Sequence, residues 1–239
     1  MRNRRGTGNI FRIEGVNFRY PVFLDLTGKK CLVTGEGPEI AGKIRALTAA
    51  SAAVTYVNER ASPEIQALAS AGSIHWESRG FQPEDLTDCF LVITDSGDNS
   101  EIFRLAEERG VLCNAVDDPK HCRFSFGSVH RQGDLTIAIS TNGGAPAVAV
   151  RLRQWLEREI GPEYGALLKL LKTFRREIMA RIPDFKTRRD LWYRIVDSDV
   201  RAKVREGHYE AAQTMIRQML EDALSSTSRS GISDDERDR

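Results

Sequence analysis

The chain has 239 residues, enough for one large domain or a main domain with smaller additions, and its 35 Lys and Arg residues nearly balance 34 Asp and Glu residues. A net charge of +1 gives no sign of the basic surface that nucleic acids or anionic membranes attract. The longest apolar runs, such as residues 89–94, are far shorter than the roughly 20 residues that cross a bilayer, so we expect a cytoplasmic protein with no membrane partner.

The first elements alternate between strands and helices. Residues 1–19 are rich in Arg, lack the apolar run of a secretory signal and are expected to be flexible. Strands are predicted at 30–34, 53–57, 73–76, 89–94 and 111–116, and helices at 43–53, 62–71 and 100–109. Such apolar strands alternating with helices predict a parallel sheet covered on both faces, so residues 20–118 are expected to form an α/β, Rossmann-like domain.

The pattern changes after residue 118. Two strands around the turn Arg131–Asp134 predict a hairpin, and a long exposed hairpin edge can pair with a second chain. We therefore expect residues 119–145 to form a strand-rich dimerisation region. Residues 146–224 show apolar stripes at helical spacing and predict a helical domain, whereas the polar residues 225–239 are expected to be disordered.

The four cysteines, at 31, 89, 113 and 122, show no C-x-x-C or Cys/His metal spacing. Most of them lie in apolar runs, where Cys behaves as a small buried hydrophobe. No metal site is therefore predicted.

Residues 31–43, CLVTGEGPEIAGK, carry part of a dinucleotide-binding fingerprint between a predicted strand and a predicted helix. Gly35 and Gly37 fit the glycines that allow a tight turn and the close approach of a pyrophosphate, but Ile40 stands at the third glycine position. Pro38 suits a helix start, where its missing N–H is no loss. Read alone, the segment fits an ordinary strand-to-helix turn equally well.

Polar residues follow the second predicted strand at the distance that the fingerprint requires. Glu59 could accept hydrogen bonds from a ribose diol and repel a 2′-phosphate, which favours NAD over NADP, although Arg60 weakens that preference. A solvated loop charge is the alternative interpretation of Glu59.

Four segments together carry a resemblance to a known family. They are YPVFLDLTGKKCLVTGEG from Tyr20, CFLVITDSGDN from Cys89, CNAVDDPKHCRFSFGSV from Cys113 and LTIAISTNGGAPAVAVRLRQWLE from Leu135. They resemble the siroheme-synthase family of precorrin-2 dehydrogenases and sirohydrochlorin ferrochelatases. The similarity runs from Tyr20 to Glu157 and, more loosely, to Leu224.

The resemblance implies a homodimer that binds NAD and a tetrapyrrole and converts precorrin-2 to sirohydrochlorin. It places the catalytic carboxylate on Asp117, at the carboxyl end of a strand, although Asp before Pro119 is also a common turn residue. The implied cofactor-binding residues are Gly35, Glu36, Gly37, Pro38, Glu39, Ile40, Asn58, Glu59, Thr94, Asp95 and Asn99. Substrate-binding residues are expected at Asn114, His121, Arg123, Ser140, Thr141, Asn142 and Gly143.

Two alternatives stay open at the level of sequence. The family's second activity inserts Fe²⁺ into sirohydrochlorin, and Asp117 could serve again by removing pyrrole protons. The segments GEGPEI and ITDSGDN depart from the family pattern. A non-catalytic tetrapyrrole- or nucleotide-binding partner protein with a degenerate Rossmann site is therefore the second alternative.

Overall fold

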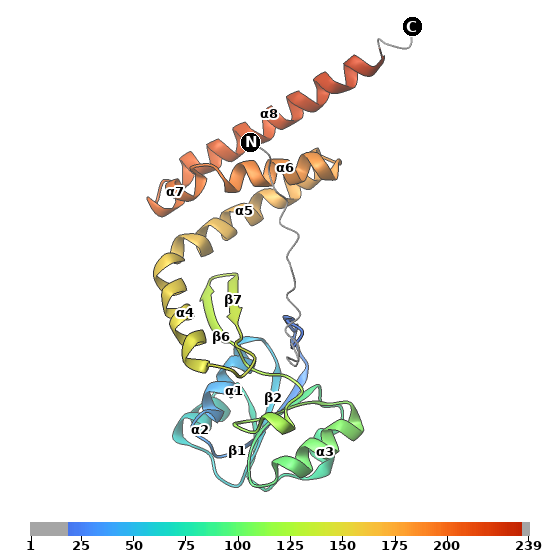
Figure 1. The fold of residues 1–239 in the computed structure, drawn as a ribbon, viewed down its shortest axis with the longest axis vertical. Helices are drawn as coiled ribbons and strands as arrows, with labels where there is room; N and C mark the ends of the chain where they lie inside the picture. The colour runs from blue at the N-terminus through green and yellow to red at the C-terminus, as the bar shows by residue number, and fades with distance from the viewer. Residues whose placement is uncertain (1–18, 236–239) are drawn as a thin grey trace. The chain divides into compact units, whose positions relative to one another are not determined.

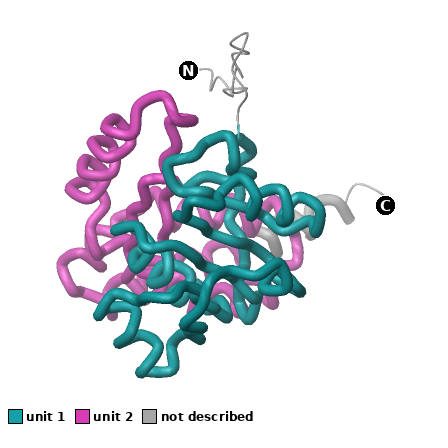
Figure 2. Tube along the Cα trace, turned by 90° about the horizontal axis from the view of Figure 1, so that it is seen from below, with its two compact units in different colours: residues 1–126 teal, residues 127–239 magenta. Residues whose placement is uncertain are grey.

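The computed structural model describes the backbone of residues 19–235 and the side chains of residues 19–226. The predicted flexible lead, apart from Arg19, lies outside the described residues. The chain forms two compact units, residues 1–126 and 127–239, which Figure 2 shows in different colours. None of the helices in the described part of the chain is long and apolar enough to cross a membrane.

The first unit, coloured from blue to green in Figure 1, contains a five-stranded, all-parallel sheet of order β3-β2-β1-β4-β5. Its strands are β1 Lys30–Gly35, β2 Ala53–Val57, β3 His75–Glu77, β4 Leu91–Asp95 and β5 Leu112–Ala115. Its helices are α1 Ile40–Ala49, α2 Pro63–Ser70 and α3 Asn99–Arg109, with 3₁₀ turns η1 Pro83–Leu86 and η2 Pro119–His121. The α/β, Rossmann-like prediction is confirmed.

Successive side chains of the central strand β1 belong to two different cores. Val33 packs with Ile44 of α1 in one buried cluster, and Leu32 packs with Ile102 of α3 in the other. Because side chains alternate between the faces of a strand, the central residues of β1, Cys31–Val33, are all apolar and are covered on both faces of the sheet. Cys31 and Cys113 are fully buried in these clusters, as their apolar runs predict.

The second unit consists of a hairpin and a helical region (Figure 1). The hairpin strands β6 Ser128–Gln132 and β7 Leu135–Ile139 pair antiparallel around the predicted turn. The helices are α4 Pro146–Glu159, α5 Pro162–Arg181, α6 Phe185–Val196, α7 Val200–Arg205 and α8 Tyr209–Asp235. Helix α8 continues beyond Leu224, so residues 225–235 are helical where their polar composition predicts disorder.

The hairpin turn lies directly against the start of α5. A Cβ on Gly165 would stand 2.8 Å from the carbonyl oxygen of Gln132, and one on Gly133 would stand 3.3 Å from the Cα of Gly165. Lys172 of α5 also pairs with Asp134 of the turn, at 2.6 Å. Backbone therefore meets backbone at this junction, and the absence of side chains on both glycines allows it.

Candidate functional site

The carboxyl ends of β1 and β4 lie side by side, with Gly35 in register with Asp95. Here the strand order reverses, since β2 lies on one side of β1 and β4 on the other. Open α/β sheets bind ligands at this kind of switch point. Gly35 has φ +112°, and a Cβ on it would stand 2.1 Å from the carbonyl oxygen of Asp95, so only glycine fits.

The second glycine of the loop lies against the Asp95 side chain. A Cβ on Gly37 would stand 1.4 Å from Asp95 Oδ2, so the carboxylate fills the space that a side chain would take. Burial raises the pKa of Asp95, and the nearby charges of Asp117 and Glu39 raise it further. Asp95 therefore interacts electrostatically with Asp117, which follows β5, and with Glu39, which directly precedes α1.

Helix α1 begins at Ile40, the position where the fingerprint has its third glycine. The Ile40 side chain is 1% exposed and belongs to the core cluster that includes Val33. The branched side chain thus packs in the core between helix and sheet. Glu39 is exposed and its carboxylate pairs with Lys43 Nζ at 3.1 Å, one turn further along the helix.

A pocket of about 590 Å³ opens beside the loop, towards the start of α2. It is lined by Glu36, Pro38 and both glycines of the loop, and by Tyr56, Arg60 and Ser62 from β2 and the segment after it. In a dinucleotide-binding fold this region, between the first two strand-to-helix connections, receives the adenosine half of the cofactor. Glu59 follows β2 as predicted, but it is exposed and does not line the pocket.

Two side chains of the β2 region hold the glycine loop in place. The Tyr56 hydroxyl donates to the carbonyl oxygen of Gly35 at 2.8 Å, and burial and the Glu36 charge raise the pKa of Tyr56 to about 12. Asn58 Nδ2 donates to Glu36 Oε1 at 3.0 Å and to the carbonyl oxygen of Arg60 at 2.8 Å. Sequence reasoning missed Tyr56, because it reads only as an aromatic residue in an apolar strand.

Thr94 and Asn99 shape the loop between β4 and α3. Thr94 is fully buried and its hydroxyl donates to Asn99 Oδ1 at 2.8 Å; the same oxygen accepts the Ser96 N–H at 3.1 Å. The two predicted cofactor residues are therefore brought together within this loop, where they define the backbone path that follows Asp95.

Asp117 follows β5 at the same edge of the sheet and has φ +55°. The left-handed conformation strains any residue with a side chain by about 1–2 kcal/mol, and Asp tolerates it better than most. Strained backbone of this kind often occurs at functional sites. The structure thus places the predicted catalytic carboxylate close enough to Asp95 to raise the Asp95 pKa.

The other predicted substrate residues of the first unit have partners within the protein. Asn114 is buried and its amide donates to the carbonyl oxygen of Phe124 at 2.8 Å. His121 Nδ1 lies 2.5 Å from an oxygen of Asp118, and Arg123 Nε donates to Glu107 at 2.7 Å. These contacts fix the segment after β5.

Residues 140–143 belong to the second unit and precede α4. The Ser140 hydroxyl accepts the N–H of Asn142 at 3.1 Å, and the Thr141 hydroxyl accepts the N–H of Ala145 at 3.3 Å. Asn142 and Gly143 both have positive φ, at +53° and +82°. The predicted substrate loop is therefore a tight turn that its own hydroxyl groups stabilise.

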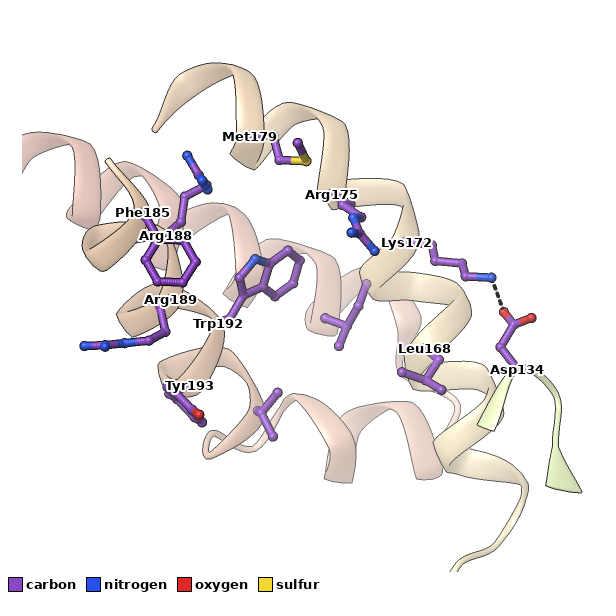
Figure 3. Close-up of a pocket in the computed structure, with 12 residues that line it drawn as sticks. Asp134, Leu168, Lys172, Arg175, Met179, Phe185, Arg188, Arg189, Trp192 and Tyr193 are labelled. Atoms are coloured by element: carbon purple, nitrogen blue, oxygen red, sulfur yellow. Dashed lines mark ion pairs between the residues drawn. The ribbon is translucent and has the colours of Figure 1, made fainter. Parts of the chain in front are cut away.

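A second concave surface lies between α5 and α6 of the second unit (Figure 3). This groove has a volume of about 900 Å³ and is lined by apolar residues that include Met179, Phe185 and Tyr193. Arg175 and Arg188 add positive charge to it. Within the described residues, no group of three or more His, Cys, Asp and Glu side chains could hold a metal ion.

The fold, the glycine loop and the pocket beside it define the class: the first unit is a dinucleotide-binding α/β domain. Family models match three consecutive segments of the chain. An NAD(P)-binding family matches residues 22–128, the central part of sirohaem biosynthesis proteins matches 132–159, and the sirohaem synthase dimerisation region matches 163–220. The dimerisation match thus covers α5, α6 and α7 and part of α8. It does not include the hairpin, which lies in the segment 119–145 that we expected to form the dimerisation region.

Curated relatives agree with these matches. The chain is 36% identical to a siroheme synthase of Thioalkalivibrio sulfidiphilus over 208 residues, which is 86% of this chain and 42% of the relative. It is 34% identical to siroheme synthase 1 of Serratia proteamaculans over 204 residues, 84% of this chain and 43% of the relative. The chain belongs to the siroheme-synthase family, and it spans less than half the length of these relatives.

A solved structure shares the fold. SirC, a precorrin-2 dehydrogenase, superposes with a TM-score of 0.69 at 23% identity, covering 85% of this chain and all of SirC. The match spans both units and therefore agrees with the order of sheet, hairpin and helices described above.

Proposed function

We propose that the chain is an NAD-dependent precorrin-2 dehydrogenase that forms sirohydrochlorin in siroheme or a related tetrapyrrole pathway. One observation carries the proposal: at the carboxyl edge of the sheet Gly35 and Gly37 lie against Asp95 and border a pocket of about 590 Å³, and Asp117 is close enough to Asp95 to raise its pKa. The names of the relatives and of SirC support the choice of substrate.

The glycine loop and its pocket fit a dinucleotide. Gly35 and Gly37 expose backbone at the start of α1, where helix N–H groups attract phosphate, and the pocket beside them has room for an adenosine. Bound NAD would supply the hydride acceptor of the reaction. Asp95 is the group that opposes this fit, because its carboxylate lies against Gly37, where the pyrophosphate would approach.

Asp117 is the proposed general base. Dehydrogenation removes a hydride and a proton from the macrocycle, so a carboxylate at the strand edge must take the proton while the hydride leaves towards the cofactor. Asp117 follows β5, next to the switch point, and its strained backbone sets the direction in which its side chain leaves the chain. A neighbouring residue, Asp118, is engaged with His121 and is a matched control.

The test is an assay with precorrin-2 and NAD that follows NADH and sirohydrochlorin together. We expect turnover by the wild type, and Asp117→Asn should lower kcat by about 100-fold or more with an unchanged melting temperature. Asp118→Asn should retain most of the activity. Absence of product with the wild type, while a known dehydrogenase works in parallel, would reject the enzyme in favour of a non-catalytic binding protein.

Fe²⁺ insertion is a second activity that the same site could support. The carboxylates of Asp95 and Asp117 interact at the carboxyl edge and could accept the two pyrrole protons that a metal ion replaces. A metal-uptake assay on sirohydrochlorin tests this activity, and a rate equal to the protein-free control would exclude it.

We also propose a homodimer in which the helical region and the hairpin meet a second copy. The groove between α5 and α6 lies within the segment that matches the dimerisation region, and Met179, Phe185 and Tyr193 are 54%, 69% and 63% exposed. Exposed apolar groups of this size are typical of interfaces. Tyr193→Glu should shift the molar mass measured by light scattering towards the monomer, whereas a dimer of unchanged stability would locate the interface elsewhere.

A further inference from the structure

The residue between the two loop glycines is an acid, and its side chain has a defined position. Glu36 Oε1 accepts a hydrogen bond from Asn58 Nδ2 at 3.0 Å, and Asn58 stands directly after β2. The second proton of the same Asn58 nitrogen goes to the carbonyl oxygen of Arg60 at 2.8 Å. Both donor positions of the amide are thus used, which fixes the amide and, through it, the Glu36 carboxylate.

This arrangement brings a carboxylate to the place where Rossmann folds use one. In that fold the acid that binds the ribose diol of the adenosine stands at the end of the second strand. Here the strand is followed by Asn58, which cannot carry charge, and Glu36 reaches the same place from the first loop. The raised pKa of Tyr56, to which the Glu36 charge contributes, also places that charge beside the end of β2.

Glu59 does not compete with Glu36 for this role. Its side chain lies outside the pocket lining, while its carbonyl oxygen accepts the Ser78 hydroxyl at 3.0 Å. Glu64 lines the pocket, but its carboxylate is paired with Arg45. Among the described residues that line the pocket, Glu36 is therefore the carboxylate without a cationic partner.

Arg60, in the segment after β2, lines the same pocket. Its side chain is exposed, and within the described part of the chain its guanidinium has no hydrogen bond or ion pair. A guanidinium is well suited to a phosphate group, which it can bind through two parallel N–H donors. The pocket therefore contains the Glu36 carboxylate, which would repel a 2′-phosphate, and the Arg60 guanidinium, which could bind it.

We propose that Glu36, positioned by Asn58, binds the adenosine ribose diol of NAD and excludes NADP, and that Arg60 binds the 2′-phosphate once the Glu36 charge is removed. The inference rests on one part of the proposed function, namely that a dinucleotide binds at the glycine loop. It assigns the preference for NAD over NADP to Glu36 of the glycine loop and not to Glu59, the acid that follows β2.

The experiment measures binding by titration calorimetry of the full chain with NAD and with NADP, separately from turnover. We expect the wild type to prefer NAD. Glu36→Gln, which keeps the size of the side chain, should tighten NADP binding about tenfold or more, because the Arg60 guanidinium can then bind the 2′-phosphate without repulsion from the Glu36 charge. Arg60→Ala in the Glu36→Gln background should abolish that gain, and the matched control Glu59→Gln should leave the NAD-to-NADP ratio unchanged.

The possible outcomes separate the inference from the proposed function. A ratio that responds to Glu59→Gln and not to Glu36→Gln would overturn the inference while leaving an NAD enzyme intact. A wild type that binds neither nucleotide would overturn the dinucleotide site itself, and the inference with it.

Trp76 Nε1 donates to the carbonyl oxygen of Asn58 at 3.0 Å, so tryptophan fluorescence gives an independent measurement of ligand binding near Asn58.

Discussion

Asp95→Asn should strengthen NAD binding. In the structure the Asp95 carboxylate lies against Gly37, the glycine whose backbone should approach the cofactor pyrophosphate. It has no hydrogen bond within the described residues, so the substitution to Asn breaks none. The main change is therefore the loss of one negative charge beside two anionic phosphates.

The magnitude follows from the distance and the exposure. A carboxylate about 5 Å from one phosphate charge repels it by about 3 kcal/mol at an effective dielectric constant of about 20. Asp95 is only partly buried, and solvent weakens this repulsion, so we expect a net gain of about 1–2 kcal/mol, or about 5- to 30-fold in Kd.

The pH dependence gives a second, independent reading. Burial and the charges of Asp117 and Glu39 raise the Asp95 pKa above its ordinary value of 3.8, and a bound pyrophosphate would raise it again. Binding therefore takes up a proton, and NAD affinity should fall as pH rises through the Asp95 pKa. The same raised pKa means that Asp95 destabilises the fold once it is charged, so Asp95→Asn should also raise the melting temperature at neutral pH.

Calorimetric titration from the ordinary carboxyl pKa of 3.8 up to neutral pH tests both parts, with Asp98→Asn as the control because Asp98 lies on the same loop and makes no cap hydrogen bond with its side chain. Asp95→Asn should bind more tightly than the wild type and show a flatter pH profile. Weaker binding by Asp95→Asn would refute the reasoning, since it would mean that the carboxylate accepts hydrogen bonds from the cofactor instead of repelling it.

Three further substitutions test the backbone of the site and of the second unit. Gly35→Ala should lower the free energy of unfolding by at least about 2 kcal/mol, because its Cβ would meet the Asp95 backbone, whereas Gly37→Ala meets only a side chain that can rotate; chemical denaturation compares them. Asp117→Gly should raise stability by about 1 kcal/mol while activity is lost, and equal or lower stability would contradict strain at φ +55°. Gly165→Ala should destabilise the second unit by about 1–3 kcal/mol through its contact with Gln132, with Gly80→Ala, which has open space, as the neutral control.

Strands β1, β2, β4 and β5 could be predicted from the sequence because each carries a buried apolar run. Strand β2 has the bounds that its β-branched run predicts, and β1 is longer by Gly35 alone. The helix predicted over residues 43–53 begins three residues earlier in the structure, at Ile40, which is also its first buried residue. The six-residue helix α7 was missed because so short a segment shows too little periodicity.

Within the site, motif spacing located the backbone positions better than the side-chain directions. Gly35, Gly37, Asp95 and Asp117 were predicted as site residues, and the sheet topology brings them to one edge. Spacing alone could not show that the residue after Asn58 turns away from the pocket. A strand end does not determine which of several neighbouring side chains faces a ligand, because the loop that follows it sets those directions.

The distribution of charge around the loop explains why the departures from the glycine fingerprint need not abolish binding. Ile40, at the third glycine position, is accommodated in the core, and Glu39 next to it is paired with Lys43. The unpaired acids are Glu36, towards the adenosine pocket, and Asp95, towards the pyrophosphate. Glu36 can accept hydrogen bonds from a ribose diol. Asp95 repels a phosphate unless its carboxylate is protonated or moves away. The same chain should therefore show selectivity from Glu36 and a limit on affinity from Asp95, and the two variants Glu36→Gln and Asp95→Asn should alter these properties separately.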